Sequence, residues 1–480
     1  MKILIIQLAR LGDIYMSWPV ARALKRKHPE AELHFLVRER FSVALEGLES
    51  VQKIHKLNSA EIFEKMFDTT DAGIKYLGNF LDGLQHENYD LVVNLTFSPV
   101  SSYFTYYIGQ TAKATVGYSR FQDSSFALKE AISAYYFAQV GPSKHNRFHL
   151  IDIFASLCDI DLQSEDFAYP VGFSFNSPIK DSYITIQLGA SQSEKTLTPF
   201  IWARVIKNFL AHHMGFKVVL IGSKDELDLA PEIYAFNSHT DIINLIGKTS
   251  VPELFPILKN SALHIGGDSL CVHITNLTKT PCLNLSFESV KFWETGPRSR
   301  GSYVLLNIQP SHVESTEVSN AIKGLLFKKP LPQLIEAVST MPSYDLKFNL
   351  INDFEWGLVK AIYLNEQFPV TDDMVFFKGV EKLNQTNNLI IETLESALVN
   401  GVSKFVKILA SCDEAIMGIR GISPKVSVYI DWCLAEKIKV PPLTENEIVE
   451  SYLKVHNELK LLIRPYLLED NTQDEVGDHG

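Results

Sequence analysis

The sequence predicts an α/β protein with two doubly wound halves, each a parallel sheet flanked by helices, followed by a helical extension. Three observations lead to this fold class. Apolar runs typical of buried strands alternate with helical segments, the same alternation restarts near residue 183, and it ends near residue 344. A chain of 480 residues is also too long for one ordinary core, so two or three domains are expected.

The composition narrows the class of protein. Hydrophobic residues make up 46% and charged residues 21%, which is typical of a soluble globular chain. A net charge of -11 argues against general nucleic-acid binding, although a local basic patch could still bind an anionic substrate. The five cysteines form no CxxC pair, so a reducing compartment is expected rather than a disulfide framework or zinc site.

The first half begins with a βαβ unit. A continuous apolar strand at Lys2–Leu8 leads through the turn Arg10–Asp13 into a helix over residues 15–27, and a second strand follows at 32–37. Ligands of such sheets bind beyond the carboxyl ends of the strands, which is where Asp13 lies. Asp13 is therefore either a catalytic carboxylate or an ordinary helix N-cap.

The rest of this half continues the alternation. Further strands are expected at 51–57, 89–95 and 116–118, and helical segments at 60–84 and 149–158. Several basic residues lie near the predicted loops: Arg120, Lys144, His145, Arg147 and His149. They are either solvated surface charges or a set that receives an anionic acceptor.

The second half starts after a linker rich in Pro, Gly and Ser at 167–182. Strands are expected at 183–188, 217–221, 241–246 and 281–285, with helices at 199–212, 251–259 and 313–326. The stretch Ile265–His273 joins a strand to a glycine pair and then to a polar cluster at a helix start. Such a stretch can seat an anion on the first-turn amides, or it can be an ordinary helix capped by Asp268 and Ser269.

From residue 344 onward apolar residues recur at helical spacing: Leu389, Leu394, Leu398, Val402, Phe405 and Leu409, then Ile448, Tyr452, Val455, Leu459 and Leu462. The predicted domains are 1–175, 176–330, a helical extension 331–468, and an acidic disordered tail 469–480. Two similar α/β halves suggest a sugar-nucleotide enzyme of the GT-B type or a two-domain binding protein. Neither half has a P-loop, and the first turn lacks GxGxxG, so an NAD or ATP site is not favoured.

Four segments resemble the ADP-heptose:lipopolysaccharide heptosyltransferases, glycosyltransferase family nine, over about the first 325 residues. They are the opening ILIIQLARLGDIYMSWPV, the loop ITIQLGASQSEK with Trp202 downstream, NLIGKTSVPEL, and GGDSLCVHITNL. Some positions depart from the family pattern. Asn94 stands where the family often has Asp, Leu270-Cys271 replaces Gly-Pro, and Ser286–Val290 replaces a Phe-Gly-Pro-Thr-Asp-Pro loop.

The resemblance implies a GT-B fold and an inverting, metal-independent transfer from a nucleotide-sugar donor, expected to be ADP-linked, with no other cofactor. Asp13 would be the general base, and Lys195 would stabilise the leaving diphosphate. The residues expected to bind the donor are Ser191, Glu226, Asp268, Ser269 and His273, and those expected to bind the acceptor are Arg10, Arg120 and Arg147.

The resemblance also implies an acceptor in the lipopolysaccharide core or a related surface glycan, an anionic glycan or glycolipid. The N-terminus lacks a signal peptide, and no apolar run is long enough to span a membrane. We therefore expect a cytoplasmic protein, with peripheral contact at the inner face of the inner membrane left open. Two alternatives remain: a catalytically weak assembly or binding protein of the same fold, and a transferase acting on a protein acceptor that the helical extension recruits.

Overall fold

The computed structural model describes residues 1–189, 195–211, 215–237, 239–288, 290–308, 313–328, 334–336 and 353–467. These residues form two compact units. The first unit consists of Met1–Val116 and Arg147–Leu350, and the second of Gly117–Asn146 and Ile351–Gly480. The segment 117–146, which lies inside the expected first domain by sequence, thus belongs to the unit that holds the helical extension.

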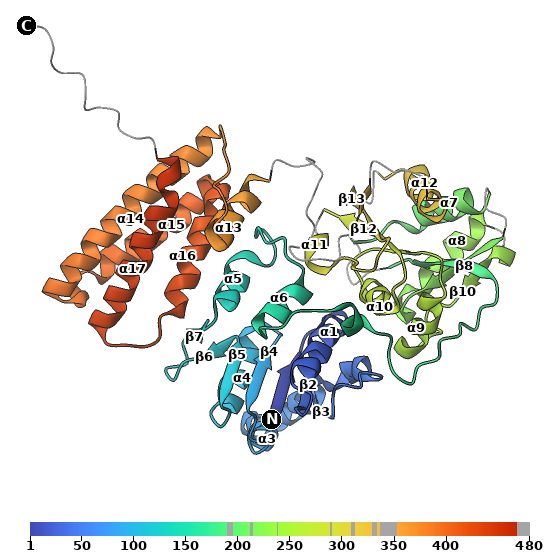
Figure 1. Ribbon diagram of the computed structural model, residues 1–480, viewed down its shortest axis with the longest axis horizontal. Coiled ribbons are helices and arrows are strands. Elements are labelled where there is room, and N and C mark those ends of the chain that lie inside the picture. The colour runs from blue at the N-terminus through green and yellow to red at the C-terminus, as the bar shows by residue number, and fades with distance from the viewer. Residues whose placement is uncertain are drawn as a thin grey trace, which may run out of the picture. The chain divides into compact units, whose positions relative to one another are not determined.

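The first sheet of the first unit has the strand order β3-β2-β1-β4-β5 (Figure 1). Its strands are β1 Lys2–Ile6, β2 Glu32–Arg38, β3 Lys53–Leu57, β4 Leu91–Asn94 and β5 Ala114–Gly117. Its helices are α1 Leu11–Lys27, α2 Ser59–Asp68, α3 Thr70–Gln85, α4 Pro99–Gly109 and α6 Leu150–Leu157. The strand β1 pairs in parallel with both β2 and β4, so the chain reverses direction across the sheet beside β1. Ligands of doubly wound sheets bind at this switch point.

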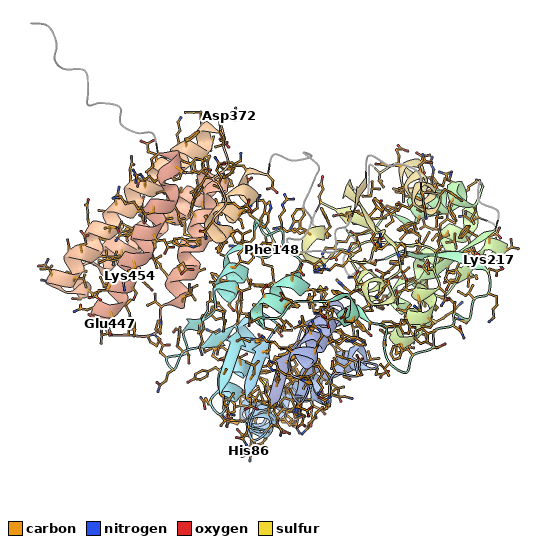
Figure 2. All side chains as sticks on the ribbon, in the orientation of Figure 1. His86, Phe148, Lys217, Asp372, Glu447 and Lys454 are labelled. Atoms are coloured by element: carbon orange, nitrogen blue, oxygen red, sulfur yellow. The ribbon has the colours of Figure 1, made fainter. Side chains whose placement is uncertain are left out.

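The second sheet has the order β10-β9-β8-β11-β12-β13-β14. Its strands are β8 Ser182–Gln187, β9 Phe216–Ile221, β10 Ile242–Asn244, β11 His264–Gly266, β12 Cys282–Phe287, β13 Tyr303–Ile308 and the antiparallel β14 Leu334–Glu336. Its helices are α7 Pro199–Leu210, α8 Ala230–Phe236, α9 Val251–Lys259, α10 Leu270–Thr278, α11 Phe292–Thr295 and α12 Ser315–Leu326. Lys217, labelled in Figure 2, lies near the start of β9. The switch point of this sheet lies between β8 and β11.

The core of the second half explains its alternating sequence. Buried side chains of β8, β9 and β12 pack against Trp202, Val205 and Phe209 of α7 and against Val318 and Ile322 of α12. The parallel strands are buried on both faces, which is why they read as continuous apolar runs rather than as alternating ones.

The second unit combines β6 Ser119–Arg120, β7 Phe126–Ala127 and α5 Ala131–Gln139 with five C-terminal helices. These are α13 Phe354–Leu364, α14 Met374–Asn400, α15 Val406–Ile422, α16 Ser427–Lys439 and α17 Glu445–Ile463, and Figure 1 shows α14 beside α17. Within this unit Gln139 donates to the carbonyl of Val428, and Lys144 forms an ion pair with Asp431 at 2.6 Å. These contacts join α5 and the residues after it to α16.

The boundaries of several elements differ from those expected. The helical segment 60–84 breaks at Thr69, whose backbone is extended and whose side chain accepts from the Ala72 amide to begin α3. The helix α4 was not predicted, although Ser98 caps it and Pro99 occupies its first turn. The apolar stripe from Leu389 to Leu409 is not one helical face, because Gly401, with φ of 88°, separates α14 from α15 and Leu389 is 48% exposed.

Within the described ranges, none of the helices has both the length and the apolar character needed to cross a bilayer. The acidic tail 469–480 lies outside the described residues.

Candidate functional site

Asp13 lies in the first turn of α1, directly beyond β1. Arg10 is the N-cap residue, and one carboxylate oxygen of Asp13, Oδ2, accepts the Arg10 backbone N–H at 3.0 Å. Asp13 is therefore not the N-cap residue that the sequence allowed. The hydrogen bond instead forms one half of a capping box. It also fixes the carboxylate at the carboxyl edge of the first sheet, where a reactive group would be needed.

His273 brings the second half to the same place. It lies in α10, is 7% exposed, and packs against α1 so closely that a Cβ added to Gly12 would lie 2.7 Å from the His273 Cδ2. Its Nδ1 is buried and has no hydrogen-bond partner among the residues that the structure describes. The ring atoms that face Gly12, the neighbour of Asp13, are Cδ2 and Nε2.

The charges of Asp13, His273 and Asp268 are close enough to shift the pKa values of Asp13 and His273. Burial raises the pKa of Asp13, against the opposing effects of the Arg10 backbone N–H and the His273 charge, while the negative charge of Asp268 raises it further. Burial lowers the pKa of His273, and the carboxylates of Asp268 and Asp13 oppose that shift. A carboxylate whose pKa is raised in this way is suited to accept a proton near neutral pH.

The turn after β11 carries Asp268 and Ser269, and neither caps α10 with its side chain. The Ser269 hydroxyl instead donates to Gln187 Oε1 at 2.6 Å, at the end of β8, and Thr295 donates to Asp268 Oδ1 at 2.8 Å. The side chain of the N-cap residue Ser269 thus makes no capping hydrogen bond at the start of α10. First-turn amides that are not capped in this way can bind an anion.

Lys195 lies next to that turn. Its carbonyl oxygen would be 2.7 Å from a Cβ on Gly267, so only glycine allows the two loops to come this close. Trp202, buried in α7, donates through Nε1 to the Leu188 carbonyl at 3.1 Å and holds the end of β8 below the loop. Ser191, the other expected donor-binding residue of this loop, lies outside the described residues.

Glu226 lies in the 3₁₀ turn Lys224–Leu229, beyond β9. Its carboxylate rests on Gly189 and Gly222, and a Cβ on Gly189 would lie 2.6 Å from the Glu226 Cδ. Burial raises the pKa of Glu226, and hydrogen bonds from the Ser223 and Gly189 backbone oppose the shift. The carboxylate is therefore held at the carboxyl edge of the second sheet, between the ends of β8 and β9.

Three arginines, Arg10, Arg38 and Arg40, lie near Asp13. Arg38, at the end of β2, donates to the Ala9 carbonyl at 3.1 Å. Its pKa is lowered by burial and then by the charges of Arg40 and Arg10, while Asp13 raises it. Neither Arg38 nor Arg40 was predicted from the sequence as a site residue. The signal was available, because β2 pairs in parallel with β1 and its carboxyl end must lie beside Asp13.

Arg147 is not part of the group around Asp13, because it packs on Trp293 in the segment that follows β12. It is 6% exposed, and its guanidinium lies 4.2 Å from the centre of the Trp293 ring. His149 Nε2 lies 3.1 Å from the Gly296 carbonyl, and Asp152 pairs with Arg298 at 2.5 Å. These contacts from the start of α6 hold residues 293–298, which include the Thr295 that binds Asp268.

Arg120 belongs to the second unit, where it donates to the Ser124 carbonyl at 3.2 Å and lies over the Phe126 ring. The residues that the structure brings together within the first unit are thus Asp13, Asp268 and His273, with Arg10, Lys195 and Ser269 around them. Arg120 and Arg147 are not among them.

Comparisons with known proteins show which family this chain is similar to. A family profile described as "Glycosyltransferase family 9 (heptosyltransferase)" matches residues 78–321. Lipopolysaccharide heptosyltransferase 3 of Escherichia coli (strain K12) is 25% identical over 291 residues, which is 57% of this chain and 79% of that protein.

Two solved structures share the fold of the α/β part. Escherichia coli heptosyltransferase WaaC with ADP-2-deoxy-2-fluoro heptose superposes with a TM-score of 0.50 at 15% identity, over 67% of this chain and 99% of that one. The family 9 glycosyl transferase of Veillonella parvula DSM 2008 gives 0.52 at 16% identity, over 68% and 98%. These similarities confirm the predicted fold class.

Proposed function

Because this chain belongs to glycosyltransferase family 9 and is a glycosyltransferase, we propose that it transfers a heptose or related sugar from an ADP-linked donor to a lipopolysaccharide core or related surface glycan. The relative from Escherichia coli is named as a lipopolysaccharide heptosyltransferase, and the WaaC structure holds an ADP-heptose analogue. The proposed transfer inverts the anomeric carbon and needs no metal ion.

The observation that carries this proposal is the meeting of Asp13 with His273 and Asp268. Asp13 takes the proton of the acceptor hydroxyl as that oxygen attacks the anomeric carbon. Burial and the Asp268 charge make its carboxylate a stronger base than a solvent-exposed one. His273, whose ring lies against Gly12 next to Asp13, orders the site or contacts the diphosphate.

The leaving diphosphate needs positive charge and hydrogen-bond donors. The Lys195 ammonium supplies the charge, and the first-turn amides of α10 supply donors. The Ser269 hydroxyl joins them by exchanging its hydrogen bond to Gln187 for one to the diphosphate. The backbone carbonyl of Lys195 lies against Gly267, so the loop that carries Lys195 runs beside the turn after β11. This arrangement neutralises the charge that develops on the leaving group with protein groups alone, which is the basis for proposing a metal-independent reaction.

The remaining parts of the substrates have candidate contacts. Glu226, fixed at the ends of β8 and β9, is placed to accept hydrogen bonds from ribose hydroxyls. Arg10 and Arg40, both exposed, lie with Arg38 on the acceptor side of Asp13. Guanidinium groups bind phosphates and carboxylates well, so this group suits an anionic glycan or glycolipid.

The experiment is a transfer assay with a panel of nucleotide sugars and a heptose-deficient lipopolysaccharide core. We expect released ADP and an acceptor that gains the mass of one heptose, with the opposite anomeric configuration to the donor by NMR. Turnover should be lost in Asp13→Asn. Turnover with another nucleotide sugar alone would contradict the donor assignment, and the absence of any sugar transfer would contradict the catalytic one.

A further inference from the structure

A second cluster of polar side chains lies in the first sheet, at the amino-terminal part of its strands and outside the site around Asp13. His34 of β2 and His55 of β3 project from the same face, because His34 is paired with Lys53 and Leu36 with His55. The His55 Nε2 lies 3.2 Å from the His34 Nδ1, and the Tyr89 hydroxyl lies 2.9 Å from the His34 nitrogen and 3.1 Å from the His55 nitrogen. His34 is fully buried and His55 partly exposed.

The orientation of His34 is set by Glu32. The Glu32 carboxylate lies 2.9 Å from the His34 Nε2. A carboxylate only accepts hydrogen bonds, so Nε2 carries the proton and Nδ1 presents its lone pair toward His55. A carboxylate that fixes the far nitrogen of an imidazole in this way is the usual support of a metal-ligating histidine.

The carboxylate of Glu87 completes the cluster. One oxygen from Glu87 and one nitrogen from each histidine all lie within 4.8 Å of one another. Glu87 also receives the ammonium groups of Lys2, at 2.8 Å, and Lys53. Each carboxylate oxygen has a second lone pair, so these ion pairs do not exhaust its capacity.

From this geometry we infer that His34, His55 and Glu87 form a binding site for one divalent cation of the zinc class, with water or the Tyr89 hydroxyl in the fourth position. Bonds of about 2.0–2.1 Å in a tetrahedral site place ligand atoms about 3.3 Å apart, close to the 3.2 Å between the two histidine nitrogens. Two imidazoles and a carboxylate are a common zinc ligand set.

The place of the cluster indicates a structural role for the metal. The three ligands come from β2, from β3 and from the residues before β4, at the end of the sheet away from Asp13. A metal there ties the edge strand β3 to the rest of the sheet, so binding should stabilise the folded chain. Without a metal the Tyr89 hydroxyl and the lysine ammonium groups satisfy the same atoms, so the chain folds in either state.

The test is titration of the untagged, chelator-treated full chain with Zn²⁺ alone by calorimetry, and with Co²⁺ by absorption. We expect one high-affinity site per chain, d–d bands typical of tetrahedral Co²⁺, and a higher melting temperature with Zn²⁺. His55→Ala and Glu87→Ala should remove the site, and Glu32→Ala should weaken it by about 10- to 100-fold. His55 and Glu87 are chosen because, unlike His34, they are partly exposed.

The matched control is His86→Ala. His86 is an exposed histidine at the end of α3 (Figure 2) whose ring nitrogen contacts the Asp82 carbonyl, so its loss should leave zinc affinity unchanged. The wild-type chain failing to bind Zn²⁺, or His55→Ala binding it as tightly as wild type, would overturn the inference. Both outcomes are read without any transferase assay.

Discussion

Gly12 of α1 and His273 of α10 are in direct contact, so that a Cβ at position 12 would lie 2.7 Å from the imidazole. One residue comes from each α/β half, and the next residue after Gly12 is Asp13. The glycine in the Leu-Gly-Asp turn is therefore required by the approach of a histidine far away in the sequence, and not by the turn alone.

Gly12→Ala should therefore lower kcat. The added methyl group must displace His273 or α1, and a shift of about 1 Å at a reacting group can cost about 100-fold in rate. Steady-state transfer kinetics, with melting temperature as a check on folding, would measure this. Gly78→Ala in α3 is the matched control, because its Cβ meets no atom within 4 Å. Equal rates for both variants would argue against the contact's importance.

Asp13→Asn should reduce kcat by about 100- to 10,000-fold, the usual contribution of a general base. Asn can still accept the Arg10 backbone N–H through its amide oxygen, so the cap of α1 and the stability of the chain should be retained. Donor affinity should change little, which separates a catalytic effect from a binding one. Near wild-type turnover would remove Asp13 from the mechanism.

Features of the fold and the site that depend on local sequence could be predicted, whereas contacts between distant residues could not. Most strands of the two large sheets, the helix Val251–Lys259 and the turn before Ser269 were predicted, because local apolar periodicity and chain breaks encode them. The strand β13 was not predicted, and Asp13, expected on a turn before the helix, lies inside α1. The contact of Gly12 with His273 could not be, because no local pattern records which distant residue packs on a glycine.

The membership of segment 117–146 in the second unit also could not be predicted, because it depends on contacts with distant residues. Its place in the second unit depends on contacts such as that of Gln139 with the Val428 carbonyl and that of Lys144 with Asp431. A lysine before a loop looks identical in sequence whether it is solvated or paired with a buried aspartate. The local sequence therefore could not decide whether these basic residues gather around an acceptor.

Asp268→Asn should move the acid limb of the pH profile of kcat/KM to lower pH. Asp13 acts as a base only when it is deprotonated, so activity falls as the pH drops through its pKa. The negative charge of Asp268 raises that pKa, and its removal therefore lowers it. Asn at position 268 can still accept from Thr295.

Asp71→Asn, in the exposed first turn of α3, removes the same charge outside the site and should leave the profile in place. An acid limb that stays fixed in Asp268→Asn, or moves to higher pH, would show that the charge of Asp268 does not act on the base.

Lys195→Ala should weaken the binding of ADP by about 10- to 100-fold, since a hydrogen bond to a charged group contributes about 1.5–3 kcal/mol and each factor of ten is about 1.4 kcal/mol. Calorimetric titration with ADP measures this without turnover. Lys207→Ala, on the exposed face of α7, is the control for loss of a nearby positive charge. Unchanged affinity in Lys195→Ala would mean that the diphosphate is held by backbone amides alone.

Among the ion pairs that the structure describes in the first unit, the buried pair of Asp152 and Arg298 should be highly sensitive to single substitution. Both side chains are less than a tenth exposed, and they lie 2.5 Å apart. Asp152→Ala leaves the guanidinium buried without its carboxylate, which should lower the free energy of unfolding by about 3–5 kcal/mol.

The double variant Asp152→Leu/Arg298→Met removes both charges and should recover much of that loss. Denaturant titration distinguishes the two variants, with Asp181→Ala, which breaks the exposed pair with Lys217, expected to leave the midpoint within error. A double variant no more stable than Asp152→Ala would mean that packing around Arg298, rather than the loss of the Asp152 carboxylate, determines the effect.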